Sequence, residues 1–243
     1  MKFGPRNNGS AVLLPGLDRV LAIGGENGGL ATATTEILDL GAGAPSWRYS
    51  ASMAFPRKNF NAVLLPDGNV LAVGGNQQGT YDAPLTAAEM FDAATETWTT
   101  MASHVAPRAY HSTAVLLPDG RVLSAGQTFG TQQTTAEIYS PPYLFRGARP
   151  VIGTAPSNVS YLDTFSVETP DADRVSRVAL IRPDSVTHGV NFDQRYVLLP
   201  FIPAGGALSI DAPTATEAPP GWYMLFLVDS DGVPSVASWI HVS

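Results

Sequence analysis

The chain contains no cysteine, only two lysines and no long hydrophobic run. Without cysteine, disulfide bonds, thiolate metal ligands and thiol catalysis are all excluded within these 243 residues. The longest apolar runs, such as Ala11–Pro15 and Tyr223–Val228, fall well short of the roughly 18 residues that a membrane-spanning helix needs. We therefore expect no membrane span and no membrane partner.

Basic charge is also scarce, because 14 Lys and Arg residues stand against 21 Asp and Glu, for a net charge of −7. Nucleic acids and anionic surfaces require a basic footprint, so we expect no nucleic-acid partner. The first residues, Met1–Arg6, lack the apolar stretch of a signal peptide. A hydrophobic fraction of 44% is ample for sizeable cores in a soluble protein of one large or two ordinary domains.

What the sequence does contain is an internal repeat. The segment Ala-Val-Leu-Leu-Pro occurs three times at spacings of 51 and 52 residues, each copy preceded by an arginine. The copies are residues 11–15, 62–66 and 114–118, after Arg6, Arg57 and Arg108. A period near 50 is typical of kelch repeats.

Each repeat predicts four strands, as its second copy illustrates. The first strand ends at the turn Asp67-Gly68, and the return strand Val70–Val73 ends at Gly74-Gly75, a pair that indicates close backbone approach or a bulge. A third strand surrounds Glu89, and Trp98 opens a fourth. Four strands make one propeller blade, but about three repeats are fewer than the four to eight blades that close a propeller. Either the chain is part of a longer protein, which we favour, or its blades associate with something else.

The repeats stop at Arg146–Pro150, and a different pattern follows. About seven short strands, separated by Pro, Gly and Asp turns, occupy the last 93 residues and predict an immunoglobulin-like sandwich. The predicted fold is all-β: a partial kelch β-propeller over residues 1–150, followed by an immunoglobulin-like β-sandwich over residues 151–243.

Three residues could carry chemistry: Tyr110, His111 and His188. Adjacent side chains of a regular strand point to opposite faces, so Tyr110 and His111 can share a site only where the backbone is irregular. Without such a site, Tyr110 is an aromatic at a blade mouth, His111 a hydrogen-bonded turn residue, and His188 a polar loop residue. For His104 and His241 we expect surface roles.

Four patterned stretches carry a resemblance to a known family: Pro107–Gly126, Thr135–Pro150, Val178–Arg195 and Ala218–Ala237. They resemble the copper-radical oxidases, the galactose oxidase and glyoxal oxidase group. Within the second stretch, Ser140–Leu144 looks more like the glyoxal oxidase branch. The resemblance implies a seven-bladed propeller with an early set immunoglobulin-like domain, extracellular secretion, and one copper ion.

The resemblance also implies roles for particular residues. His111 and His188 would bind copper through their imidazoles, and Tyr110 would be an axial ligand that accepts the substrate's proton; imidazole and phenolate donors suit Cu(II). The three side chains should then converge within a few Å. Asp193-Gln194-Arg195 matches a family motif and is expected to brace the loop of His188.

One departure from the family limits these expectations. Such oxidases hold a radical on a second tyrosine joined to a cysteine, whereas this chain has no cysteine and carries Lys58-Asn59-Phe60 at the matching position of its second repeat. Two hypotheses follow. The chain is the C-terminal portion of an oxidase that converts a primary alcohol, aldehyde or carbohydrate with O2 and releases H2O2, or it is a non-catalytic kelch and immunoglobulin-like module that binds carbohydrate or protein. Whether the protein is an enzyme stays open at this point; for this chain alone we expect copper binding without turnover.

Overall fold

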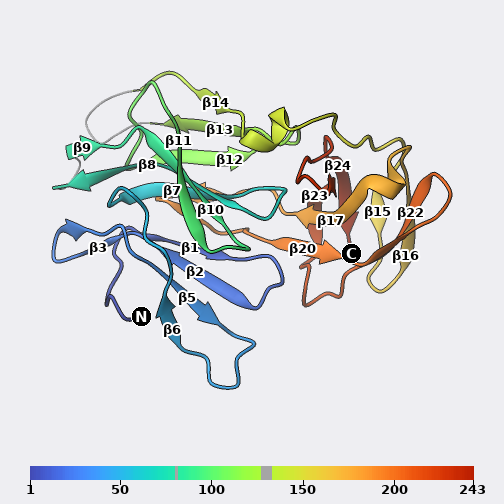
Figure 1. The fold of residues 1–243 in the computed structure, drawn as a ribbon, viewed down its shortest axis with the longest axis horizontal. Helices are drawn as coiled ribbons and strands as arrows, with labels where there is room; N and C mark the ends of the chain where they lie inside the picture. The colour runs from blue at the N-terminus through green and yellow to red at the C-terminus, as the bar shows by residue number, and fades with distance from the viewer. Residues whose placement is uncertain (80–81, 127–132) are drawn as a thin grey trace.

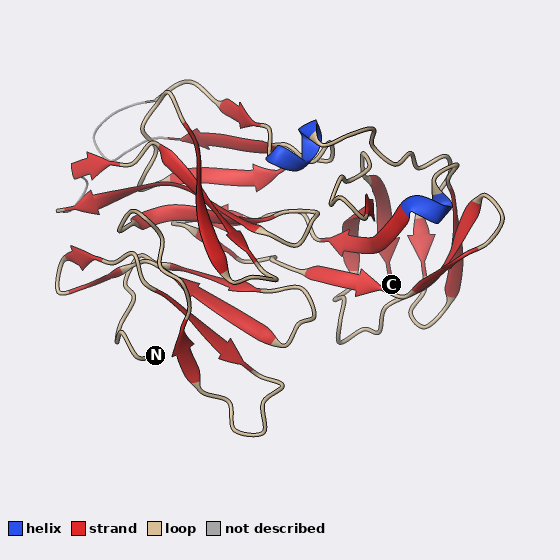
Figure 2. Cartoon of the chain, viewed as in Figure 1, coloured by secondary structure: helices blue, strands red, loops and turns tan. Residues whose placement is uncertain are grey.

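The computed structural model describes residues 1–79, 82–126 and 133–243, and their regular secondary structure is almost entirely β (Figure 2). Their helical elements are two short 3-10 turns, η1 (Pro142–Phe145) and η2 (Ala172–Arg174). No helix in the described residues is long and apolar enough to cross a membrane. The prediction of an all-β fold is confirmed.

The described part of the first half forms three antiparallel sheets, one for each repeat, and a separate two-stranded sheet of β3 and β4. The first sheet has the order β1-β2-β5-β6, the second β7-β8-β10-β11 with β9 beside β8, and the third β12-β13-β14. The bounds are β1 Ser10–Leu13, β2 Arg19–Ile23, β3 Glu26–Asn27, β4 Leu30–Ala31, β5 Thr35–Asp39, β6 Trp47–Tyr49, β7 Lys58–Leu64, β8 Val70–Gln78, β9 Asp82–Pro84, β10 Ala87–Asp92, β11 Thr97–Ser103, β12 Ser112–Leu116, β13 Val122–Gly126 and β14 Glu137–Tyr139.

The first strands of the three sheets lie next to one another, with β7 between β1 and β12 (Figure 1). This central position explains why β7 is buried at every residue. The first two repeats have the expected four-stranded order, and the described part of the third has three strands. That these sheets belong to a propeller stays a prediction.

In each repeat, an ion pair joins the arginine before the first strand to the glutamate of the third strand of the sheet. In the second repeat, Arg57 Nη2 donates to Glu89 Oε2 at 2.5 Å and Arg57 Nη1 to the Gly74 carbonyl oxygen at 3.1 Å. Glu89 Oε1 accepts from the N–H of Ala54, three residues before the arginine, at 2.6 Å. The equivalent pairs are Arg6–Glu36 at 3.5 Å and Arg108–Glu137 at 3.3 Å.

The glycine pairs let neighbouring repeats approach closely, as the sequence predicts. The N–H of Gly75 donates to the Arg108 carbonyl oxygen at 2.7 Å. A Cβ on Gly74 would collide with the same oxygen. The N–H of Gly25 likewise donates to the Arg57 carbonyl oxygen, at 2.8 Å. Each glycine pair therefore makes the backbone contact with the next repeat.

The second half forms a two-sheet sandwich, as predicted. One sheet has the order β15-β24-β23-β17-β20, the other β16-β22-β21, and a separate hairpin β18-β19 projects from the first. The bounds are β15 Asn158–Val159, β16 Thr164–Glu168, β17 Val175–Ile181, β18 Val186–Thr187, β19 Val190–Asn191, β20 Tyr196–Leu199, β21 Phe201–Pro203, β22 Ala207–Asp211, β23 Gly221–Asp229 and β24 Ser238–Val242.

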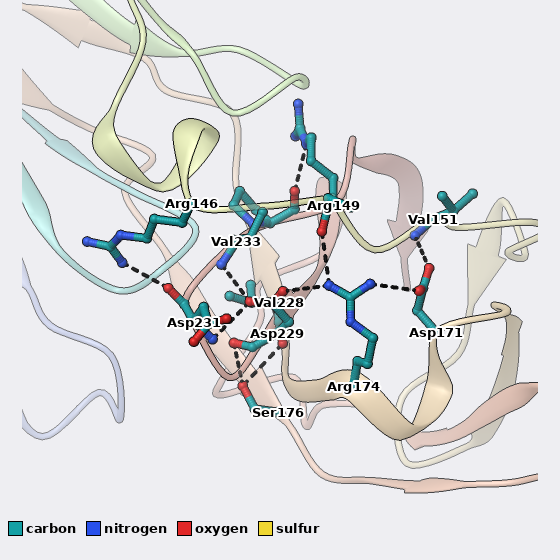
Figure 3. Close-up of polar contacts among 12 residues, drawn as sticks. Arg146, Arg149, Val151, Asp171, Arg174, Ser176, Val228, Asp229, Asp231 and Val233 are labelled. Carbon is teal, nitrogen blue, oxygen red and sulfur yellow. Dashed lines mark hydrogen bonds and ion pairs between the residues drawn. The ribbon is translucent and has the colours of Figure 1, made fainter.

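The linker between the halves is fastened to the sandwich by arginines (Figure 3). Arg146 donates to the Asp231 carbonyl oxygen at 2.9 Å, and Arg149 to the Pro234 carbonyl oxygen at 2.8 Å. Arg174 bridges the carboxylates of Asp171 and Asp229 nearby (Figure 3). The predicted boundary at residue 150 falls in this linker.

Two apolar cores share the central strand β23. Tyr223, Leu225 and Leu227 pack inside the sandwich, against the second sheet. Met224 and Phe226 point the other way and belong to the same core as the repeat sheets. The first core therefore extends from the repeat sheets onto the outer face of the sandwich, and β23 takes part in both cores.

Candidate metal centre

Tyr110 and His111 lie in the turn that enters β12, and the backbone there is irregular, as a shared site requires. His111 has a φ of 65°, in the left-handed region. The N–H of Ser112 donates to the Ala109 carbonyl oxygen at 2.9 Å, which closes a tight turn around both residues. The rings of Tyr110 and His111 consequently stack, with centroids 3.9 Å apart.

The left-handed position of His111 recurs in every repeat. Asn8, Asn59 and His111 are spaced 51 and 52 residues apart. Their φ angles are 57°, 55° and 65°. Asparagine and histidine are among the non-glycine residues that adopt this region most readily. The repeat therefore fixes the backbone position, and the third copy places an imidazole where the others have an amide.

His188 lies at the tip of the β18–β19 hairpin. The strand register leaves His188 and Gly189 as a two-residue turn, with φ angles of 55° and 76°. Two positive φ angles are what a type I′ hairpin turn requires. Gly189 also abuts β7, because a Cβ there would lie 2.5 Å from the Phe60 carbonyl oxygen. The His-Gly dipeptide between two short β segments was the signal for this turn, which sequence reasoning treated only as a loop.

The hairpin brings His188 to Tyr110 and His111. The two Nε2 atoms of the histidines are 3.1 Å apart. The Tyr110 ring centroid lies 5.4 Å from that of His188. Nδ1 of His188 hydrogen-bonds Thr187 Oγ1 at 2.8 Å, which leaves its Nε2 to face His111. The structure thus brings the three rings together, as expected, and both imidazoles are exposed to solvent.

Side chains at the base of the hairpin tie it to the first strands of two repeats. Gln194 Oε1 accepts from the N–H of Leu13 in β1 at 2.9 Å. Asp184 Oδ2 accepts from the N–H of Leu116 in β12 at 2.7 Å. Within the expected brace Asp193–Arg195, Gln194 is the residue that reaches a blade strand. Sequence reasoning did not single out Asp184, since nothing local marks its partner.

A polar cleft of about 450 Å³ opens beside Tyr110. Lys58 Nζ pairs with Glu26 Oε2 at 2.5 Å on its wall, and Asn8 Nδ2 donates to Glu26 Oε1 at 3.1 Å. Asn59 also lines the cleft. These groups can hydrogen-bond hydroxyls of a ligand that reaches Tyr110.

The other two histidines lie away from this centre. The surface role predicted for His104 is wrong, because both of its ring nitrogens are buried. It lines a cavity of about 80 Å³ with Ser124 and Glu137, where the second and third sheets meet. Burial lowers the pKa of the His104 imidazole. His241 is partly buried and packs edge-on against Trp222, with ring centroids 5.3 Å apart.

The donor atoms of the centre fit a nitrogen- and oxygen-ligated copper ion. Two imidazole nitrogens 3.1 Å apart can both lie about 2 Å from one metal ion. The Tyr110 ring lies next to both imidazoles, and its phenol oxygen would extend the donor set to one that suits Cu(II). The described residues contain no cluster of three His, Cys, Asp or Glu side chains, so a metal here depends on Tyr110 or on ligands from elsewhere.

Comparison with known proteins places the chain in a family. Residues 9–142 match the sequence family described as "Glyoxal oxidase N-terminus", and residues 149–242 match "Galactose oxidase-like, Early set domain". This chain belongs to the galactose oxidase and glyoxal oxidase family. The family membership and the early set sandwich predicted from the sequence are therefore confirmed.

Similar full-length members are longer than this chain. A galactose oxidase of Gibberella zeae is 33% identical over 231 residues, covering 88% of the chain and 34% of that protein. An aldehyde oxidase of Vitis pseudoreticulata is 34% identical over 229 residues, covering 82% of the chain and 43% of that protein. The solved structure of a fungal alcohol oxidase in complex with copper superimposes with a TM-score of 0.88 at 30% identity, over 98% of the chain and 54% of that structure. The chain thus spans between a third and about half of the length of these relatives.

Proposed function

We propose that Tyr110, His111 and His188 are the part of a single copper site that this chain supplies to a galactose oxidase-like or glyoxal oxidase-like enzyme. The observation that carries the proposal is the 3.1 Å approach of the two Nε2 atoms across a hairpin from the other half of the chain. The fungal alcohol oxidase that superimposes on the chain was solved with copper, which supports the assignment.

The overall reaction would convert a primary alcohol and O2 into an aldehyde and H2O2, or an aldehyde hydrate and O2 into a carboxylic acid and H2O2. When bound, copper would accept one of the two electrons removed from the substrate. His111 and His188 would hold the ion through Nε2, with Thr187 fixing the ring of His188. Tyr110, which lines the cleft, would accept the proton of the substrate hydroxyl.

The cleft beside Tyr110 supports a polar small-molecule substrate. Its wall carries the Lys58–Glu26 ion pair and the amide of Asn59. Such groups hydrogen-bond hydroxyls, which favours a carbohydrate or another polyhydroxylated alcohol or aldehyde. The alcohol and aldehyde branches of the family are both represented among the similar proteins.

Further blades of the same protein are the partner that we propose. The second oxidising equivalent of a one-copper oxidase needs an organic site, and the chain has no cysteine to form the cysteine-linked tyrosine of the resembled family. These relatives are two to three times as long as the region that matches. We place the kelch blades at residues 1–150 and the sandwich at 151–243, within a secreted enzyme.

A titration of the purified chain with Cu(II) under anaerobic conditions, followed by electron paramagnetic resonance, tests the metal site. We expect one copper ion per chain with nitrogen hyperfine structure, and loss of most binding in His111→Ala and in His188→Ala. A peroxide-coupled assay on sugar alcohols and aldehydes should show no turnover. Binding that is unchanged in both variants would refute the site, and robust H2O2 release would refute the need for further blades.

A binding module without redox chemistry is the second candidate, and the missing cysteine favours it. In that case the polar cleft would bind carbohydrate in the absence of copper. Calorimetric titration of the metal-free chain with galactose and glycerol distinguishes the two, since an oxidase fragment should bind these ligands weakly before copper is added.

A further inference from the structure

The first strands β1 and β12 are edge strands of their sheets, and this leaves a row of backbone N–H groups without ladder partners. The order of the sheets places β1 and β12 at one end each. The N–H groups of Leu14 and Leu117 point inward, to the carbonyl oxygens of Arg19 and Arg121. Because N–H groups alternate in direction along a strand, those of Leu13 and Leu116 point outward, away from the sheet. Burying them without an acceptor would be costly.

Two side chains of the His188 segment accept hydrogen bonds at the same position of two repeats. Leu13 and Leu116 hold equivalent places in the Ala-Val-Leu-Leu-Pro segments. Gln194 Oε1 accepts from the N–H of Leu13, and Asp184 Oδ2 from the N–H of Leu116. The segment from Asp184 to Gln194 in the sandwich half thus contacts the same repeat position in the first and the third repeat.

Asp184 makes a second contact, on the other side of the His188 turn. Its Oδ1 accepts from Asn191 Nδ2 at 2.5 Å. Asn191 Oδ1 in turn accepts from the N–H of Ser185 at 3.0 Å. One carboxylate therefore joins β12 to the far strand of the hairpin. Burial raises the pKa of Asp184 to about 6, so at neutral pH the group is ionised and both oxygens accept.

We propose that Asp184 is a positioning residue, which holds Nε2 of His188 opposite Nε2 of His111. The strand it grips, β12, begins at the residue after His111, so the carboxylate fixes the hairpin on the same strand that carries the first histidine. Gly189 against Phe60 limits movement toward β7 only. This inference rests on the proposed copper site, and it assigns no contact between Asp184 and the metal.

The hydrogen-bond polarity of this contact allows a swap experiment. Asp184→Asn keeps an oxygen that accepts from the N–H of Leu116. It places an NH2 group against the NH2 group of Asn191, so that two donors face each other. The double variant Asp184→Asn with Asn191→Asp restores one donor and one acceptor. Asp211→Asn is the matched control, because Asp211 is an exposed aspartate of β22, in the other sheet of the sandwich, and its carboxylate accepts from Thr164 Oγ1.

Copper affinity and metal-free geometry are measured separately at pH 7.5. We expect Asp184→Asn to weaken Cu(II) binding by about ten- to a hundredfold, the range for residues that orient metal ligands. The double variant should recover to within about threefold of the unmodified chain, and Asp211→Asn should bind copper as tightly as the unmodified chain. In the metal-free chain, the nuclear Overhauser contact between the rings of His111 and His188, whose centroids are 4.8 Å apart, should disappear in Asp184→Asn and return in the double variant.

The outcomes separate the two proposals. A ring contact that persists in folded Asp184→Asn, or a double variant that recovers neither readout, overturns the positioning role. A ring contact that follows the swap while the unmodified chain binds no copper supports the positioning role and refutes the copper site. Should Asp184→Asn fail to fold, the single variant Asn191→Asp opposes two carboxylates at the same contact and is expected to give the same losses.

Discussion

At the residue scale, the centre depends on one substitution within a repeated backbone position. Asn8, Asn59 and His111 all adopt the left-handed conformation before a first strand. The asparagines there donate to nearby side chains, Asn8 to Glu26 and Asn59 to Asn76, whereas the imidazole of His111 reaches His188. Structure and metal binding can therefore be separated at this position.

His111→Asn should retain the stability of the chain and lose its copper. Asparagine adopts the left-handed region readily, so we expect a change in the free energy of unfolding within about 0.5 kcal/mol. His111→Val should destabilise the chain, because a β-branched residue is strained at a φ of 65°. Urea unfolding and Cu(II) titration of both variants check this; equal stability of the two would contradict the role given to the turn.

The buried imidazole of His104 should make stability depend on pH. Burial lowers its pKa in the folded chain, so the unfolded chain binds a proton more readily just below the ordinary value of about 6.5. Stability should therefore fall as the pH drops below about 6.5, until the folded imidazole also becomes protonated. In His104→Phe, which cannot titrate, the melting temperature should change less between pH 7 and pH 5; parallel pH curves would contradict the prediction.

At the element scale, each repeat is closed by an arginine and a glutamate that lie far apart in sequence. The Arg57–Glu89 pair is fully buried, with side chains 0% and 1% exposed, while Glu137 in the third repeat is 27% exposed. The sequence pattern revealed both residues of each pair without revealing that they meet. The same motif therefore has different energetic weight in different repeats.

Glu89→Ala should be among the most destabilising single substitutions in the chain. It leaves the buried guanidinium of Arg57 without a counter-charge, a loss of about 3–5 kcal/mol. Glu137→Ala is the matched variant and should cost less, because water reaches that carboxylate. Chemical denaturation of the two variants gives the comparison, and similar losses would contradict the assigned difference in burial.

Gly189→Ala tests the hairpin turn. A left-handed alanine costs about 1–2 kcal/mol, and its Cβ would also meet the Phe60 carbonyl oxygen at 2.5 Å. Gly206→Ala is the control, since Gly206 has a φ of 87° and nothing within 4 Å of an added Cβ. Both variants should lose stability through strain, but Gly189→Ala should also lose copper affinity; equal affinity would show that the hairpin tip does not need this fit.

At the scale of the whole molecule, the two halves are held as one by β23. Alternate residues of that strand enter two different cores, and Tyr196 adds a hydrogen bond from its hydroxyl to the Pro66 carbonyl oxygen at 2.8 Å. Burial raises the pKa of Tyr196 well above its ordinary value, so the hydroxyl remains a donor at any ordinary pH. The candidate metal centre depends on this union, because its two histidines come from different halves.

The chain should consequently unfold in one cooperative transition. The shared core couples the repeat sheets to the sandwich, and unfolding either half would expose Met224 and Phe226 to water. Differential scanning calorimetry should give a calorimetric enthalpy close to the van't Hoff value. Two resolved transitions would show that the halves are stable independently.

The sequence alone indicated the two kinds of β-structure and the residues that could carry chemistry. The 51-residue and 52-residue spacing predicted sheets built alike, and the end of that spacing predicted a second kind of β-structure. Tyr110, His111 and His188 stood out by residue type and by family resemblance. These features are local, so a single chain read in order displays them.

Only the tertiary structure decided which distant groups meet. Asp184 accepts a hydrogen bond from β12 and Gln194 accepts one from β1 because both are edge strands. The position of a strand at an edge is a property of the whole sheet, which the local sequence does not reveal. His104 was misjudged for the same reason, since its polar neighbours in sequence conceal the junction between two sheets. The approach of His188 to His111 likewise depends on the core that joins the two halves, because burial couples residues by their position in space and not by their spacing along the chain.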